Sequence, residues 1–178
     1  MKEKNEPVEL PVATADGKFI ACYSENGLAE LEFPNPKRRS RGDESQTQNS
    51  VGDSSHRLLQ DKIRGWHRLT EVALKKFLTG SASQKLPPLD WTGKTEFQKS
   101  VWRALLKIAP GKTKSYGEIA RAIGRPKAVR AVGGACGANP IPVLVPCHRV
   151  LAANNKLGGF SGGLERKRSL LKREGIKI

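Results

Sequence analysis

The first third of the chain alternates short apolar-rich runs with turn signals. Asp-Gly and Asn-Gly dipeptides, which favour the tight turns of β-hairpins, separate the runs. The runs cover residues 9–14, 18–24 and 28–33. The pattern predicts an antiparallel β-meander that ends at Pro34, with Cys22 inside it as a small core residue.

The next stretch, residues 35–55, is polar and has a single large apolar residue, Val51. Such a segment cannot bury enough apolar surface to offset the entropy of ordering, so we expect a flexible loop. The basic cluster over residues 37–41 could bind phosphate or act as a nuclear-localisation signal. We interpret it as a solvated part of the loop.

Helical spacing of apolar residues begins after this loop. Residues 56–78 predict a long helix that ends before Gly80 and covers one face of the meander. Residues 86–90 predict an extended connection. Further helices are expected from Thr95 (capped by Thr95 or Thr92) to Pro110, over 116–123 with Ser115 as its cap, over 127–137 and over 164–174.

The two helices over 116–123 and 127–137 flank a Gly-Arg-Pro turn, which is typical of a helix-turn-helix. The second helix is basic and rich in Ala and Gly, without Asn, Gln, Ser or Thr to recognise base edges. Its small residues either permit tight helix packing or let the backbone approach a ligand. We expect it to approach a narrow groove and phosphates with little sequence readout.

These elements predict an α+β protein with two domains. Residues 1–90 would form a small antiparallel β-meander with a helix, a ribonuclease H-like arrangement, including the flexible loop 35–55. Residues 91–178 would form a mostly helical domain that contains the helix-turn-helix.

The charge of the chain is concentrated in the second of these parts. The net charge is +15, and residues 91–178 contribute +14 of it through 18 Lys and Arg and four Glu. This asymmetry indicates a polyanion partner for the second part, with nucleic acid as the leading candidate and a generic basic surface as the alternative.

Other compositional features exclude several classes of protein. Three Cys without a CxxC pair, together with three His, argue against a disulfide scaffold and against a structural zinc cluster. There is no apolar run near 18 residues and no signal-peptide pattern, so neither a membrane span nor secretion is expected. We expect an intracellular protein without a cofactor or a metal at its site, while metal binding by the first part of the chain stays open.

The chemistry is concentrated in the decapeptide 141–150, Ile-Pro-Val-Leu-Val-Pro-Cys-His-Arg-Val. Its prolines and apolar residues predict a buried, extended segment that ends at Cys147. A buried thiol can be inert packing, but the adjacent His148 and Arg149 favour a reactive one, because cations stabilise a thiolate. Both interpretations stay open on this segment alone.

A thiol–imidazole pair usually requires a third group to orient the imidazole. The four carboxylates of the second part are Glu96, Glu118, Glu165 and Glu174. The first three lie early in predicted helices, where capping or the helix dipole explains them. Glu174 lies at the wrong end of its helix for the dipole, so we expect it to be the third member.

Four motifs then resemble the O6-alkylguanine-DNA alkyltransferase family. They are Ser-Tyr-Gly-Glu-Ile-Ala (115–120), Arg-Ala-Val-Gly-Gly-Ala (130–135), Asn-Pro-Ile-Pro-Val-Leu-Val-Pro-Cys-His-Arg-Val (139–150) and Gly-Phe-Ser-Gly-Gly-Leu (159–164). The resemblance covers residues 94–176 in order and spacing, and weakly the first 33 residues. Pro-Cys-His-Arg-Val is highly specific in this setting.

The resemblance implies a DNA-repair protein that flips an O6-alkylguanine out of duplex DNA through the minor groove. The alkyl group would move irreversibly to Cys147, one transfer per molecule. His148 would act as base through a water, Glu174 would orient His148, and Tyr116 would donate toward the guanine ring.

Other residues would bind the base or the DNA. Arg130 would fill the gap left in the base stack, Asn139 would hold the turn before the reactive cysteine, and Ser161 would hydrogen-bond the base. The remaining expected contacts are Ser115, Ala128, the backbone at Val145 and at Cys147, and Phe160, which replaces a Tyr of some relatives and keeps its stacking. Cys136 is expected to be a small interface residue.

We expect a monomer that needs no cofactor, whose partner is duplex DNA with O6-alkylguanine, while O4-alkylthymine and the size of the alkyl group stay open. The compartment would be the cytoplasm of a prokaryote or the nucleus of a eukaryote. Three other classes compete with this interpretation. A damage sensor would lack the acceptor cysteine, a transcription regulator would carry base-reading side chains, and a Cys-His hydrolase would need an oxyanion hole and a small substrate.

Overall fold

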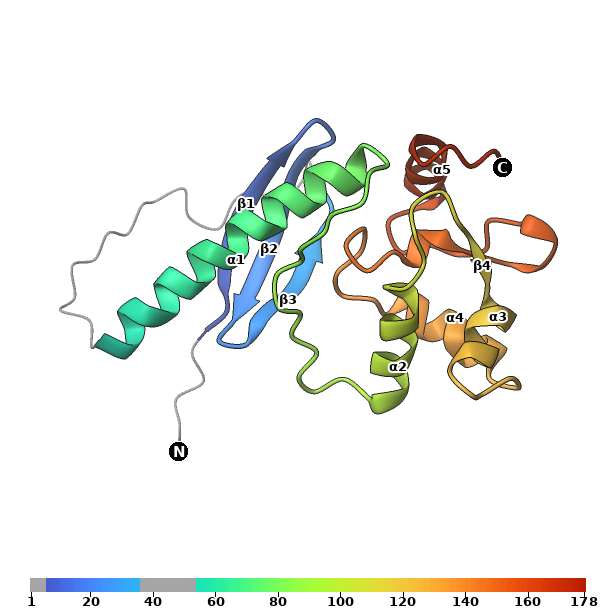
Figure 1. The fold of residues 1–178 in the computed structure, drawn as a ribbon, viewed down its shortest axis with the longest axis horizontal. Helices are drawn as coiled ribbons and strands as arrows, with labels where there is room; N and C mark the ends of the chain where they lie inside the picture. Colours follow the sequence, from blue (N-terminus) through green and yellow to red (C-terminus); the bar gives the residue numbers. More distant parts are fainter. Residues whose placement is uncertain (1–5, 36–53) are drawn as a thin grey trace.

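The computed structural model describes residues 6–35 and 54–178. A three-stranded sheet with one long helix forms one side of the molecule, and the remaining helices form the other (Figure 1). Most of the predicted loop 35–55, including the basic cluster at 37–41, lies outside the described residues. Within the described part, no helix is long and apolar enough to cross a membrane.

The sheet consists of β1 (Val8–Thr14), β2 (Gly17–Ser24) and β3 (Gly27–Glu32), antiparallel and in that order. This confirms the predicted meander within one residue at each strand end. Residues 86–90 extend the sheet beyond β3, since Leu28 N donates to Pro88 O (2.8 Å) and Asp90 N donates to Leu28 O (2.8 Å). Gly27, with φ 146°, permits this approach because a Cβ there would lie 2.3 Å from Pro88 O.

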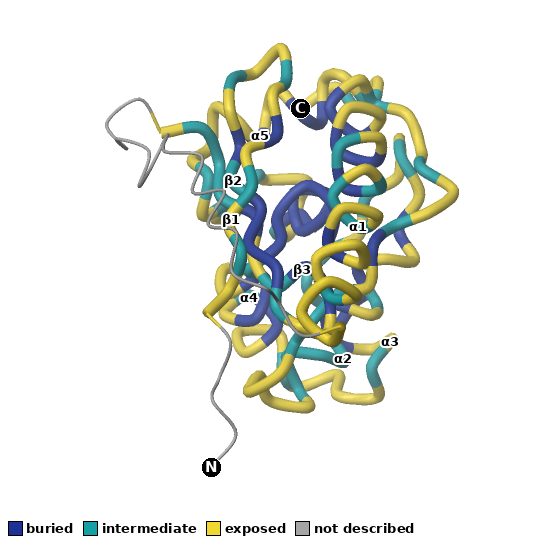
Figure 2. The backbone as a smooth tube through the Cα atoms, turned by 90° about the vertical axis from the view of Figure 1, so that its left-hand side faces the viewer, coloured by how far each residue is buried: buried dark blue, intermediate teal, exposed yellow. Residues whose placement is uncertain are grey.

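Helix α1 (Ser54–Leu78) packs on one face of this sheet, as predicted. Its buried side chains include Ile63, Leu74 and Phe77, and Tyr23 Oη of β2 donates to Thr70 Oγ1 across the interface (2.8 Å). Buried positions gather in the interior of the molecule, whereas the outward turns of α1 are exposed (Figure 2).

The second part of the chain is mostly helical, which confirms the α+β class. Two short strands, β4 (Lys114–Ser115) and β5 (Val150–Leu151), pair in parallel and were not predicted. The elements are α2 (Glu96–Leu105), β4 (Lys114–Ser115), α3 (Tyr116–Ala122), α4 (Val129–Gly137), the 3-10 turn η1 (Cys147–Arg149), β5 (Val150–Leu151), the 3-10 turn η2 (Ala153–Asn155) and α5 (Leu164–Arg173).

Both predicted helix caps are present. Thr95 forms a capping box with Gln98 at the start of α2, and Ser115 forms one with Glu118 at the start of α3. Five helix ends differ from the prediction by one to five residues: α1 begins at Ser54, α2 ends at Leu105, α3 ends at Ala122, α4 begins at Val129, and α5 ends at Arg173.

The prediction of an extended segment before Cys147 is wrong. Residues 141–146 are buried but form a compact turn, in which Val143 has φ 73° and Val145 N donates to Ile141 O (2.9 Å). The side chain of Asn139 closes this turn from both ends, accepting from Ile141 N (3.1 Å) and donating to Val145 O (2.8 Å). An amide that satisfies both backbone groups makes the turn more favourable than a strand without a partner.

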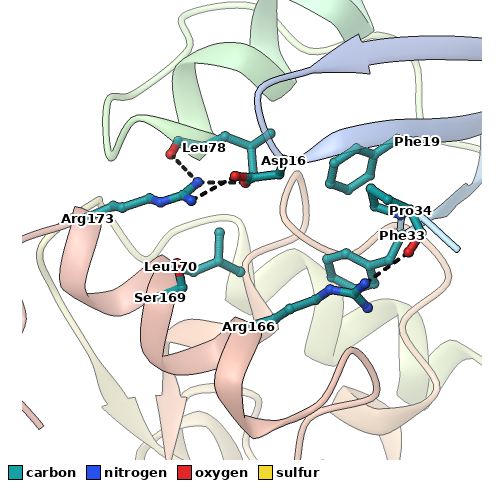
Figure 3. A pocket seen from close by; sticks show the side chains of 9 residues that line it. All are labelled: Asp16, Phe19, Phe33, Pro34, Leu78, Arg166, Ser169, Leu170 and Arg173. Carbon is teal, nitrogen blue, oxygen red and sulfur yellow. Dashed lines mark hydrogen bonds and ion pairs between the residues drawn. The ribbon is translucent and has the colours of Figure 1, made fainter. Parts of the chain in front are cut away.

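The two sides of the molecule are joined at several points. Leu31 N of β3 donates to Pro140 O (2.9 Å), and Arg173 of α5 forms a two-pronged ion pair with Asp16 at the β1–β2 turn (2.6 and 2.7 Å). Figure 3 shows this ion pair beside a pocket between the sheet and α5. Buried side chains from both sides belong to one cluster, and the division at residues 90 and 91 stays a prediction.

Candidate active site

A cavity of about 540 Å³ opens beside Cys147, within the range of about 300–1,000 Å³ typical of small-molecule sites. Its wall is built by α3, α4, η1 and the glycine-rich loop that precedes α5. The lining residues are Tyr116, Val129, Arg130, Gly133, Cys136, Gly137, Cys147, Gly159, Phe160 and Ser161.

Cys147 begins the 3-10 turn η1 and lines the cavity, and only 4% of its surface is exposed. Asn139 Nδ2 donates to its Sγ at 3.2 Å. Burial raises the pKa of the Cys147 thiol, while the Asn139 hydrogen bond and the charge of Lys167 partly oppose that rise. The thiol is therefore protonated at rest, and its reaction as a thiolate requires removal of the proton.

His148 and Glu174 form the expected pair behind the thiol. His148 Nε2 lies 3.0 Å from Glu174 Oε1, and both side chains are almost completely buried. His148 Nδ1 is also buried and has no hydrogen-bond partner within the part of the chain that the structure describes. Burial lowers the pKa of His148, although Glu174 opposes the shift, so a neutral imidazole with one free nitrogen is available as a base.

Arg149 is a member of this cluster that the sequence interpretation placed incorrectly. Its guanidinium was expected to stabilise the thiolate of Cys147, but it points to Glu174, donating from Nη2 at 2.8 Å, and from Nη1 to Ile108 O at 2.6 Å. Burial opposes ionisation of Glu174, but hydrogen bonds from His148 and Arg149 outweigh it and lower the pKa of Glu174 to about 2. Glu174 is therefore a fixed anion that holds both side chains.

Tyr116, the first residue of α3, also lines the cavity. Burial raises the pKa of Tyr116, and the nearby thiols of Cys136 and Cys147 raise it further. Its hydroxyl therefore stays protonated and can donate a hydrogen bond into the cavity. Gly158, with φ 64°, permits the close approach of this ring, because a Cβ there would lie 3.0 Å from the Tyr116 hydroxyl.

The helix-turn-helix presents its second helix at the mouth of the cavity. Val129, Arg130, Gly133 and Gly137 of α4 line it, so the small residues leave the backbone accessible. Arg130 is exposed and borders the cavity, as its expected role requires. Ala128 precedes α4, and Ser115 caps α3.

The structure thus brings five of the expected residues into one cavity wall: Cys147, Tyr116, Arg130, Phe160 and Ser161. His148, Glu174 and Asn139 lie behind the thiol. Val145 does not line the cavity, and its carbonyl already accepts from Asn139 Nδ2 (2.8 Å) and from Cys147 N (2.8 Å). Its expected contact with a base stays a prediction.

The sequence interpretation did not predict the places of three residues at this site. Cys136 was expected to be a small interface residue, but it lines the cavity beside Cys147. Arg149 and Lys167 are buried cations whose partners are largely carbonyls and a carboxylate distant in sequence. Only the helical periodicity could have indicated that Lys167 is buried. It lies three and four residues before Leu170 and Leu171, and therefore on the apolar face of the helix.

One group of potential metal ligands lies away from this cavity. The side-chain ligand atoms of Cys22, Glu30 and Glu32 all lie within 4.8 Å of one another on the sheet. Glutamates of this kind are common without an ion, and the group contributes nothing to the cavity.

Comparison with known proteins agrees with this geometry. Residues 96–176 match the family model described as "6-O-methylguanine DNA methyltransferase, DNA binding domain". The matched range contains every residue that lines the cavity, together with His148, Arg149, Lys167 and Glu174.

Individual relatives extend the similarity over most of the chain. The methylated-DNA–protein-cysteine methyltransferase of Methanosarcina acetivorans is 41% identical over 159 residues, covering 89% of this chain and 92% of the relative. A crystal structure of the O6-methylguanine methyltransferase of Mycobacterium tuberculosis is 33% identical with a TM-score of 0.69, covering 94% of this chain and 92% of the other. A structure of the protein OGT from the same organism in complex with DNA is 35% identical with a TM-score of 0.63, covering 92% and 90%.

Proposed function

Because the chain belongs to the 6-O-methylguanine DNA methyltransferase family, we propose that it repairs duplex DNA by taking the alkyl group of O6-alkylguanine onto Cys147. The activity is that of a methylated-DNA–protein-cysteine methyltransferase. The observation that carries the proposal is the cavity in which the Cys147 thiol, backed by His148 and Glu174, faces the Tyr116 hydroxyl.

The reaction is a displacement at the alkyl carbon. The thiol proton of Cys147 passes through a water to His148 Nδ1, whose imidazole Glu174 orients from the other side. The thiolate sulfur then forms a bond to the alkyl carbon as the carbon–O6 bond breaks, and the electron pair moves onto guanine. Tyr116 donates a hydrogen bond to the guanine ring and stabilises the charge that develops there. The proton held on His148 then passes through water to the departing guanine, so an unmodified base leaves, the imidazole is neutral again and the protein keeps a thioether.

The thioether explains why one molecule carries out one transfer. A thioether has no ionisable proton, and a carbon–sulfur bond is not broken by the water or the bases of this site. The cysteine is thus consumed as a co-substrate, which makes the reaction stoichiometric.

The target atom is unreachable inside a stacked duplex, so the guanine must be flipped into the cavity at a cost of a few kcal/mol. We place α4 in the minor groove, where its small residues allow close approach and Arg130 occupies the space that the base leaves. Phe160 and Ser161 would hold the flipped base by stacking and hydrogen bonding, and Ser115 and Ala128 would contact the DNA near the helix-turn-helix.

We further propose that the protein acts as a monomer on O6-alkylguanine in any sequence context, in the compartment that holds the DNA. Its charge supports this, since residues 91–178 carry a net +14 that suits contacts to phosphates. The alternative of a non-reactive damage sensor is disfavoured by Cys147 itself, because a sensor needs no acceptor thiol in the cavity.

The decisive test is the intact mass of the protein after incubation with a duplex containing O6-methylguanine. We expect a gain of one methyl group per molecule, located on Cys147 by peptide mapping, and no further repair after one equivalent of DNA. Cys147→Ser should bind the same duplex and transfer nothing. An unchanged mass, or sustained turnover by the pure protein, would reject the proposal.

A further inference from the structure

Lys167, in the second turn of α5, is the only lysine among the described residues whose side chain is completely buried. Its Nζ donates to Val150 O (2.7 Å), to Leu157 O and to Gly159 O (3.3 Å). Val150 lies in β5, directly after η1, and the other two carbonyls belong to the glycine-rich loop that borders the cavity. One ammonium group thus joins the reactive turn to the loop opposite it.

A buried ammonium normally requires an anionic partner, because its transfer from water is unfavourable. Within the ranges 6–35 and 54–178, no carboxylate lies within 4.0 Å of Lys167 Nζ. Three carbonyl dipoles satisfy its hydrogen bonds but leave its charge uncompensated. The ionisable groups that interact with this charge are the thiols of Cys147 and Cys136 and the imidazole of His148.

We propose that Lys167 is a positioning residue whose fixed positive charge stabilises the Cys147 thiolate and whose hydrogen bonds hold the glycine-rich loop against the cavity. The inference rests on the proposed function in taking Cys147 as the reactive thiol. Transfer of the thiol proton to His148 leaves the thiolate in an apolar, buried position. Lys167 supplies a positive charge without a carboxylate partner among the described residues, whereas the charge of Arg149, and the charge that His148 gains with the proton, are both paired with Glu174.

Other groups around the thiol are accounted for. Asn139 Nδ2 donates to the sulfur at 3.2 Å and acts as a neutral dipole. Tyr116 and Cys136 are held protonated by burial, and both would disfavour an anion at Cys147 if they ionised. Arg130 is exposed at the cavity mouth, where solvent screens its charge. Lys167 is therefore the buried cation that can act on the thiolate.

The test follows the pH dependence of Cys147 alkylation by iodoacetamide in the absence of DNA, with the product mapped by peptide mass. Lys167→Met removes the charge and keeps the length of the side chain. We expect the midpoint of its pH–rate profile to rise by about one unit and its rate at pH 7 to fall about tenfold. Lys167→Arg, which keeps the charge, should retain the midpoint of the unmodified protein.

Several outcomes would overturn the inference. A purely structural role predicts a lower unfolding temperature of Lys167→Met with an unchanged midpoint, and a shift in Lys167→Arg equal to that in Lys167→Met would exclude a role of charge. If Lys167→Met does not fold, Lys167→Gln, which is neutral and still donates hydrogen bonds, carries the same comparison. Lys172→Met, the same substitution at an exposed position of α5, is the matched control and should not shift the midpoint.

This readout is independent of repair. If the unmodified protein failed to take a methyl group from DNA, the proposed function would be wrong, and the iodoacetamide profile would still report whether Lys167 acts on the thiol.

Discussion

Glu174 connects several parts of the active site through one carboxylate. That carboxylate accepts from Arg149 and lies 3.0 Å from His148 Nε2, and Glu174 ends α5 as the C-cap residue. The buried side chains of His148 and Arg149 thus share Glu174 as their anionic partner. Removing that anion should affect both the orientation of the imidazole and the stability of the fold.

Glu174→Gln should therefore slow methyl transfer at least about tenfold and lower the free energy of unfolding at pH 7 by about 3 kcal/mol. The carboxyl has a folded-state pKa of about 2, below its ordinary value of 4.5, so its contribution is complete above pH 4.5 and is lost as the pH falls toward 2. Urea unfolding at pH 7 and pH 3 should show a larger loss for the unmodified protein than for the variant.

Glu165→Gln is the matched control for this change. Glu165 lies in the first turn of the same helix, and its side chain is 88% exposed. We expect it to alter neither methyl transfer nor the acid dependence of unfolding. Equal acid sensitivity of Glu174→Gln and the unmodified protein would contradict the assignment of Glu174 as the buried anion.

The sequence allowed part of this residue-level description to be predicted. Cys147 and His148 are adjacent in a distinctive motif, and Glu174 could be chosen because local helix effects explained the other carboxylates. Lys167 and the true partner of Arg149 could not be found in this way. Lys167 donates to the carbonyl of Val150, and Arg149 donates to the carboxylate of Glu174 and the carbonyl of Ile108, which only the folding of distant segments places beside them.

At the scale of elements, local signals predicted the helices well. The capping boxes at Thr95 and Ser115 involve residues three positions apart, so they can be recognised without tertiary information. The segment before Cys147 was predicted incorrectly because its prolines and apolar residues indicate that it is buried, but not whether its backbone is extended or turns back on itself. The Asn139 side chain decides that geometry, by bonds to backbone groups up to six residues away.

The small residues of α4 lead to a prediction in which stability and binding change in opposite directions. Gly134 is exposed and lies one turn after Arg130, and a Cβ added to it would meet no heavy atom within 4 Å. Gly134→Ala should stabilise the fold by about 0.5–1 kcal/mol, since alanine favours the helix. If α4 lies against DNA as proposed, the added methyl group should weaken binding of a duplex, measured by fluorescence anisotropy.

Gly65→Ala separates the two effects. Gly65 is an exposed mid-helix glycine of α1, also with free space around a Cβ, and it lies outside the helix-turn-helix. It should give a similar gain in stability with unchanged DNA affinity. Unchanged affinity for Gly134→Ala as well would place the DNA on a different face of the molecule.

At the scale of the whole molecule, the two sides differ in charge and in what they contribute to the active site. Residues 91–178 carry nearly all of the net positive charge, whereas residues 1–90 carry a net +1. The sheet therefore contributes little to attraction of DNA. Its contacts indicate mechanical support instead, because Arg166 of α5 donates to Pro34 O (2.9 Å) and its guanidinium lies 4.9 Å from the centre of the Phe33 ring (Figure 3).

Phe33 also connects the sheet to the wall of the cavity. Its ring centre lies 5.8 Å from that of Phe160 in the cavity wall, in an edge-to-face arrangement. Gly162 accommodates the pair, because a Cβ there would lie 2.6 Å from Phe33 Cε2. A side chain that follows β3 thus presses on the loop that would hold the flipped base.

Phe33→Ala should consequently lower the free energy of unfolding by about 2 kcal/mol, since the ring is half-buried, and should slow methyl transfer several-fold at temperatures where the variant is folded. Affinity for undamaged duplex should not change, because α4 and its charges are untouched. Single-turnover transfer, thermal unfolding and anisotropy measure the three effects separately.

Phe33→Leu, which keeps most of the apolar volume, should recover much of the rate. Transfer at the normal rate by a folded Phe33→Ala protein would mean that the loop holds its position through Lys167 and α5 without help from the sheet.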